Sequence, residues 1–321
     1  MKTKKTIKHL VDAVLVAAIM GLIFTGCKKS SNSTVSPIDD SPAQALSASD
    51  QSRVEEESNQ SMDDVNSAME GVSTTRSAQA FSFASCANIS VDTSQAATGL
   101  IVLNYNGNNC ANTKLRSGSI SIQLPYINGS VVRWHVQGAS ITLTFNNYKV
   151  TRLSDNKSLT LNGTHTITNV SGGVIATITS GTPRVHKIRA NMQLTFDDGT
   201  NRTWQAARTR TFTIANNIIS EQIVGDTTVS NYNNVAMWGT NRAGTNFYIS
   251  IPTPVVENIL GGTCLYKPLS GVRVHNGIAH PITVTYGVDT NGNAVTSGCP
   301  YGWKANWTNG QGVAKQVIVS Y

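Results

Sequence analysis

The stretch from Arg184 to Ile214, RVHKIRANMQLTFDDGTNRTWQAARTRTFTI, carries the residues best suited to binding an anion. Asp197-Asp198-Gly199 fits a three-residue hairpin loop in which the glycine takes a positive φ. The expected facing pairs are Phe196 with Thr200, Leu194 with Arg202, Met192 with Trp204, Ala190 with Ala206, Ile188 with Arg208, and His186 with Arg210. One face therefore changes from apolar to basic away from the turn. Its basic end is a candidate site for a carboxylate or phosphate, made by Arg184, His186, Arg208 and Arg210.

A structural interpretation of the same face stands beside the functional one. The basic end of the hairpin can reach solvent where the core ends, or its arginines can pair with the few acids of the chain. If the arginines are buried, each needs a partner, because a buried unpaired charge is costly. We favour this structural interpretation.

The segment YGWKANW holds a second candidate binding feature. Exposed aromatic rings stack on sugars, and strand alternation would place Tyr301, Trp303 and Trp307 on one side as a platform. The same alternation is typical of core residues, and we favour the core interpretation.

Catalytic residues are harder to find, and we assign none. A glycosidase needs two placed carboxylates, but the acids after residue 81 lie mainly in turn-like contexts. There is no Gly-x-Ser-x-Gly elbow. The histidines after residue 81 are scattered and no zinc-binding spacing occurs, so we predict neither a metal site nor a cofactor.

Charge is divided unevenly along the chain. The full sequence has a formal charge of +7, whereas Asp39 to Glu70 holds nine acids and one arginine. Residues 81–321 hold 17 Lys or Arg against 8 Asp or Glu, a charge of +9. A basic body favours anionic polymers or lipid surfaces. No nucleic-acid motif is present, so nucleic acid is not an expected partner.

The first residues are typical of an export signal. Four lysines precede a short apolar run that ends in Phe24-Thr25-Gly26-Cys27. This exit is similar to the lipobox of bacterial lipoproteins, which predicts a signal peptide over 1–26 and lipidation of Cys27. The expected location is the cell envelope, with the body tethered to the outer membrane through acyl chains. Cleavage near Gly26 by an ordinary signal peptidase is the alternative.

The remaining cysteines, Cys86, Cys110, Cys264 and Cys299, are even in number, which in an oxidising compartment predicts two disulfides. Three pairings are possible. We favour Cys86–Cys110 and Cys264–Cys299, because each pair brackets one strand-like segment.

The elements expected to position these residues are one helix and many strands. A flexible tether is expected over 27–49 and an acidic amphipathic helix over 50–71, with Asp50 as its N-cap. Val54, Ser58, Met62, Val65 and Met69 recur at helical spacing. The helix needs packing to persist, for which the basic body offers a surface, and its acidic face is expected to be solvated.

Residues 81–321 alternate apolar and polar side chains with a period of two, punctuated by Asn-Gly and Asp-Gly steps. The predicted fold class is all-β, an antiparallel sandwich or curved meander with one short N-terminal helix. A weak internal duplication suggests two lobes, 81–225 and 226–321; convergence on common hairpin chemistry is the alternative.

Several motifs resemble a family of Bacteroidota cell-envelope lipoproteins with an all-β body. They are Gly26-Cys27, Cys86 and Cys110 with Arg116-Ser-Gly118, the central LNGTHTITN, Cys264 with Ser270-Gly271, and Tyr286-Gly287 followed by Cys299 and Asn309-Gly310. The resemblance covers most of residues 81–321. It implies an envelope location and an all-β fold, and it implies no particular activity.

The expected function is a binding or structural role in the envelope, on a glycan or an anionic polymer. A hydrolase of the envelope or of polysaccharide, whose carboxylates the sequence does not pair, and an accessory subunit of an envelope complex are the alternatives. Two carboxylates converging in a cleft would favour the hydrolase.

Overall fold

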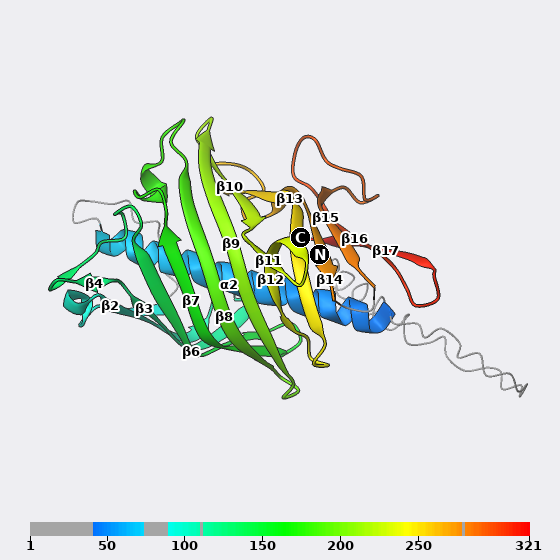
Figure 1. Cartoon of the computed structure of the whole chain (residues 1–321), viewed down its shortest axis with the longest axis horizontal. Coiled ribbons are helices and arrows are strands. Elements are labelled where there is room, and N and C mark those ends of the chain that lie inside the picture. The colour runs from blue at the N-terminus through cyan, green and yellow to red at the C-terminus, as the bar shows by residue number, and fades with distance from the viewer. Residues whose placement is uncertain (1–40, 74–88, 110–111, 278–279) are drawn as a thin grey trace, which may run out of the picture. The chain divides into compact units, whose positions relative to one another are not determined.

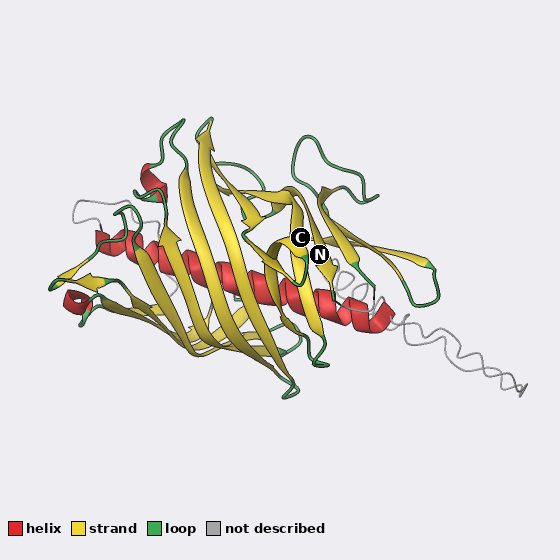
Figure 2. Ribbon diagram, viewed as in Figure 1, coloured by secondary structure: helices red, strands yellow, loops and turns green. Residues whose placement is uncertain are grey.

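The computed structural model describes residues 41–73, 89–109, 112–277 and 280–321. One long helix, α2 (Ser41–Ser73), precedes an antiparallel β body (Figures 1 and 2). The strands are β1 (Ile89–Asp92), β2 (Leu100–Asn108), β3 (Lys114–Gln123), β4 (Tyr126–Ile127), β5 (Ser130–Val131), β6 (Ser140–Arg152), β7 (Ser158–Asn169), β8 (Arg184–Phe196), β9 (Asn201–Ala215), β10 (Ile218–Gly225), β11 (Thr227–Val229), β12 (Tyr232–Thr240), β13 (Asn246–Leu260), β14 (Pro268–Asn276), β15 (Ile282–Val288), β16 (Gly302–Thr308) and β17 (Ala314–Ser320). Short 3-10 turns lie at Ala96–Thr98 and Ile175–Thr177.

The main sheet follows the order of the chain with few exceptions. Its strands run β1-β2-β3-β6-β7-β8-β9-β10-β13-β14-β15-β16-β17, while β12 pairs with β9, β11 and β13, and β4 pairs with β5 alone. The expected all-β, antiparallel body is confirmed. The sheet crosses residues 225–226 without a break, since β9 pairs with β12 and β10 with β13. The suggested division into two lobes at this point is therefore wrong.

The β8–β9 hairpin has the register that its sequence predicts. His186 faces Arg210, Ile188 faces Arg208, Met192 faces Trp204, and Leu194 faces Arg202. Phe196 and Thr200 close the loop through a backbone hydrogen bond of 3.0 Å, and Gly199 takes a φ of 78°. This positive φ is the reason that the three-residue Asp-Asp-Gly loop fixes the register.

Helix α2 is longer than the sequence pattern indicated. It begins at Ser41, so residues 41–49 are helical rather than part of a tether, and Asp50 lies inside the helix rather than capping it. Ala43, Ala45 and Leu46 are good helix formers, and Pro42 suits the first turn, which accounts for the earlier start. The expected apolar stripe is confirmed: its five members are all buried, four of them in the same core cluster as the strands.

Four of the five acids of α2 whose side chains the structure describes lie against the sheet and are not solvated as expected, whereas Glu56 is exposed. Figure 1 shows strands of the body curving around the helix. The helix acids meet basic side chains of the sheet in ion pairs: Asp50 with Arg242, Glu55 with Arg273, Glu56 and Glu57 with Lys114, and Asp64 with Arg116. The partners come from β3, β14 and the turn after β12. Opposite charges of the helix and the body thus meet at their contact surface.

The cysteine pairing can be followed for one of the two predicted disulfides. Cys264 and Cys299 are bonded, with their Cα atoms 5.4 Å apart, as predicted. Cys86 and Cys110 lie outside the described residues, and so does Cys27. No helix in the described ranges is both long and apolar enough to cross a membrane.

We predict that Asp64→Ala lowers the free energy of unfolding by about 3 kcal/mol, because it leaves the buried guanidinium of Arg116 unpaired. The two side chains are 16% and 6% exposed and their charged atoms are 2.9 Å apart. Urea unfolding followed by tryptophan fluorescence measures the change.

The matched control is Asp155→Ala, which breaks the exposed ion pair with Arg152 on the surface of the body. Exposed pairs contribute about 0–1 kcal/mol. Equal losses for the two variants would contradict the assignment of Asp64 as an interior counter-charge.

Candidate functional site

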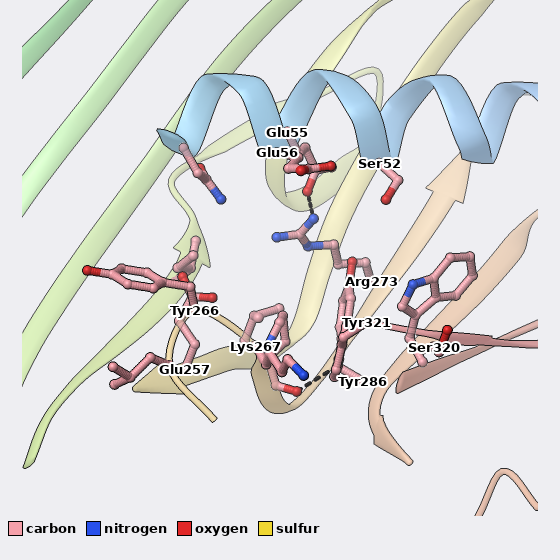
Figure 3. A pocket seen from close by; sticks show the side chains of 16 residues that line it. Ser52, Glu55, Glu56, Glu257, Tyr266, Lys267, Arg273, Tyr286, Ser320 and Tyr321 are labelled. Atoms are coloured by element: carbon pink, nitrogen blue, oxygen red, sulfur yellow. Dashed lines mark hydrogen bonds and ion pairs between the residues drawn. The ribbon is translucent and has the colours of Figure 1, made fainter. Parts of the chain in front are cut away.

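The candidate site is a pocket of about 440 Å³ between α2 and the C-terminal strands. This volume lies within the range of small-molecule sites. Figure 3 shows the lining side chains converging from the helix and from the sheet. The lining residues are Ser52, Glu55, Glu56, Asn59, Ile223, Val255, Glu257, Leu265, Tyr266, Lys267, Pro268, Arg273, Tyr286, Trp303, Ser320 and Tyr321.

One wall of the pocket is held by the ion pair between Arg273 of β14 and Glu55 of α2 (Figure 3). The guanidinium of Arg273 also lies 5.2 Å from the ring centroid of Tyr286 on β15. Both charged side chains are less than a tenth exposed, so the pair is largely shielded from water. Arg273 thereby fixes the distance between helix and sheet and positions one aromatic ring of the site.

Tyr321 is held in the pocket wall by two hydrogen bonds. Its hydroxyl donates to the carbonyl of Pro268 at 2.6 Å and accepts from the backbone N–H of Gly287 at 3.3 Å. Burial raises the pKa of Tyr321, so the phenol stays protonated and keeps donating. The ring is therefore fixed on β14 and β15 as part of the wall.

Aromatic and charged groups share the lining. Tyr266, Tyr286, Trp303 and Tyr321 contribute rings, while Glu56, Glu257 and Lys267 contribute charge. Glu257 on β13 is 8% exposed and lies directly opposite Glu221 of β10. Rings that stack beside carboxylate and ammonium groups that hydrogen-bond are suited to a ligand with flat apolar faces and hydroxyl edges.

The predicted aromatic platform is divided by the structure. Trp303 and Trp307 both pack with Ile282, Val284 and Ala305, but of the two only Trp303 lines the pocket. Tyr301 precedes β16, is 45% exposed and does not line the pocket. The strand alternation placed the two tryptophans correctly, whereas Tyr301 lies outside the strand that would align it with them.

The predicted basic cluster lies on the inner face of the sheet and not on this pocket. Arg210 is bound by the fully buried Glu221, as the structural interpretation required. His186 is buried between the rings of Trp134 and Phe212, and its ring centroid lies 5.0 Å and 5.1 Å from theirs. Arg208 is 1% exposed, and Arg184 is half-buried and opposite Phe212.

Burial also sets the protonation of the interior. Together with the smaller effect of nearby arginines, it lowers the pKa of His165, His186 and His275 to about 3. It lowers the pKa of Arg202 and of Arg208 to about 10. The three histidines are therefore neutral at physiological pH, whereas the two arginines keep their charge. Within the described ranges no group of three or more His, Cys, Asp or Glu side chains could hold a metal ion.

Several pocket residues were not indicated by the sequence. Glu55 was assigned to a solvated helix face, and Glu257, Arg273 and Tyr321 carried no local signal. Their convergence depends on contacts between α2 and strands about 200 residues further along the chain. The one available signal was the opposite charge of the two regions.

Comparisons with protein-family models, with curated proteins and with solved structures find no match for this chain. The resemblance to envelope lipoproteins therefore stays a prediction, and function has to be argued from the site itself.

We predict that stability falls as the pH drops below about 6.5. The unfolded chain protonates its histidines near that value, whereas the folded chain keeps His165, His186 and His275 neutral down to about pH 3. The unfolded state then binds more protons, so each histidine contributes a loss of about 1.4 kcal/mol per pH unit.

Urea unfolding between pH 7.5 and 5 measures this slope. His186→Phe, which keeps a ring between Trp134 and Phe212, should reduce the slope by about a third. His135→Gln, at an exposed position, should leave it unchanged. An unfolding free energy that is constant over this pH range would refute the prediction.

We also predict that replacing Cys264 and Cys299 together by serine destabilises the protein by about 3–4 kcal/mol. The bond closes a loop with a sequence separation of 35, and opening it frees the unfolded chain. It also anchors the segment that carries Tyr266 and Lys267 into the pocket wall.

Thermal unfolding with and without reductant measures the loss. The wild type should melt at a lower temperature in reductant, and the double-serine variant should show a smaller decrease, because only the predicted Cys86–Cys110 bond is left to reduce. An equal decrease in the two proteins would contradict the prediction.

Proposed function

We propose that the protein is a binding protein of the cell envelope that takes a carbohydrate in the pocket between α2 and β13–β17. The observation that carries the proposal is the lining, in which four aromatic rings stand beside carboxylate, ammonium and hydroxyl groups in about 440 Å³. Rings stack on the C–H faces of a sugar, and the polar groups hydrogen-bond its hydroxyls.

The location in the envelope is part of the proposal. It is supported by the basic, apolar and Gly-Cys sequence of residues 1–27, which would tether the body to the outer membrane through the acyl chains on Cys27. The chain-following strand order supports a curved meander over a sandwich for the body. Such a body would present its pocket to polymers of the envelope.

A hydrolase is the second candidate, and one observation favours it. Glu257 lines the pocket and lies directly opposite Glu221, so two carboxylates are neighbours on one sheet face. Against catalysis, Glu221 is fully buried and bound by Arg210, so it is already engaged in an ion pair. Binding without turnover is therefore the better supported function.

The test is a glycan-array screen followed by titration calorimetry with the oligosaccharide that binds. We predict that Trp303→Ala weakens binding about tenfold, because a stacking ring contributes about 1.4 kcal/mol. The matched control is Trp307→Ala on the same strand, whose side chain does not line the pocket and which should leave the affinity within about twofold.

Equal affinities for wild type and Trp303→Ala would refute the pocket as the site, and an array without any bound glycan would refute the ligand class. Release of shorter sugars by the wild type but not by Glu257→Gln would replace the binding function by hydrolysis.

A further inference from the structure

The buried face of β9 carries an unusual density of cationic side chains. Arg202, Trp204, Ala206, Arg208 and Arg210 follow one another on this face, and all are less than a tenth exposed. Two of the three guanidiniums have a hydrogen-bonded acceptor: Arg210 is bound by Glu221, and Arg202 donates to the side-chain amide oxygen of Gln51 on α2. Arg208 is the third.

Arg208 has no acceptor for two of its donor atoms. Its side chain is 1% exposed, and its Nε and Nη2 have no hydrogen-bond partner among the described residues. Its cross-strand neighbours are Ile188 and Gly225, which offer no side-chain acceptor. The charges of Glu221 and Glu257 partly offset the lowering of the Arg208 pKa by burial, but neither carboxylate binds Nε or Nη2 of Arg208, and Glu221 binds Arg210. Nε and Nη2 form the side of the guanidinium that binds an anion with two parallel hydrogen bonds.

The rings beside Arg208 also carry buried polar atoms without hydrogen-bond partners among the described residues. The guanidinium carbon lies 5.8 Å from the ring centroid of Trp204, whose indole Nε1 is buried and unpartnered within the described structure. The ring of His165 on β7 lies 5.8 Å from that of Trp204, and both of its nitrogens are likewise buried and unpartnered in the described ranges. His165 on β7 pairs with Ala190 on β8, and Ala190 pairs with Ala206 on β9. Ala206 is also the residue between Trp204 and Arg208 on this face of β9, so the side chains beside these polar groups are small.

Such an arrangement is costly for the protein alone. A buried donor without an acceptor costs about 1–3 kcal/mol. A single anion within reach of the guanidinium and the indole N–H would satisfy several donors together. The side chains of Arg208, Trp204 and His165 are each 1% exposed or less, which restricts an occupant to a small ion.

We propose that the interior of the sheet binds one small monovalent anion of halide size, held by Nε and Nη2 of Arg208 and by Nε1 of Trp204, beside His165. None of these three residues lines the pocket between α2 and the C-terminal strands. The anion site is therefore independent of the proposed carbohydrate function, and its role is to accept hydrogen bonds from the buried donors where β7, β8 and β9 meet.

Bromide, used as a probe on the full chain, tests the proposal directly. Crystals grown in bromide should show an anomalous peak within about 3.5 Å of the Arg208 and Trp204 donors. In solution, each tenfold rise in bromide above its Kd should raise the Tm by about 4 °C, because the ion binds only the folded state.

Arg208→Met should lose both the peak and the dependence of Tm on bromide. The matched control is Arg189→Met on the neighbouring strand, whose side chain is half-exposed and paired with Asp226; this variant should keep both. If Arg208→Met does not fold, Trp204→Phe removes the indole donor while keeping a ring, and should weaken the bromide dependence.

Three outcomes overturn the proposal. They are a water molecule in place of bromide, protein oxygens bound to Nε and Nη2 of Arg208, and a bromide dependence of Tm that Trp204→Phe or Arg208→Met leaves unchanged.

Discussion

The structure depends on the neutralisation of an acidic helix by a basic sheet. Asp50, Glu55, Glu57 and Asp64 would each be costly to bury alone, and so would the arginines and lysine that face them. Brought together, they form ion pairs along α2 that join it to β3, β14 and the turn after β12. The apolar stripe of α2 buries apolar surface against the sheet, while the ion pairs fix the position of the helix on the sheet.

The candidate site is a consequence of this placement. The pocket has the helix as one wall and the C-terminal strands as the others, so it exists only where Glu55 and Arg273 hold the two together. The rigid sheet positions Tyr286, Trp303 and Tyr321, and the disulfide Cys264–Cys299 anchors the segment of Tyr266. The buried ion pair and the residues that line the pocket therefore share one region of the molecule.

Local patterns in the sequence predicted local structure well. The alternation of β8 and β9 and the Asp-Asp-Gly loop fixed their register because side chains in strands repeat every two residues. The apolar stripe of α2 was likewise predictable. The ion pairs of its acids were not predictable, because no residue near Glu55 in the sequence indicates that Arg273 is its partner. The one sequence signal for these contacts was the opposite net charge of the two regions. It predicts that they attract each other, but it does not predict which residues pair.

The ion pairs of α2 also bear on how the chain folds. Most strands pair with a neighbour in sequence, so hairpins such as β8–β9 close short loops. The hydrogen bonds between Asp50 and Arg242, in contrast, span a sequence separation of 192. Because the entropy of loop closure must be overcome before such contacts form, seating of the helix belongs to the latest stage of folding. Until then, the arginines of the inner sheet face remain hydrated.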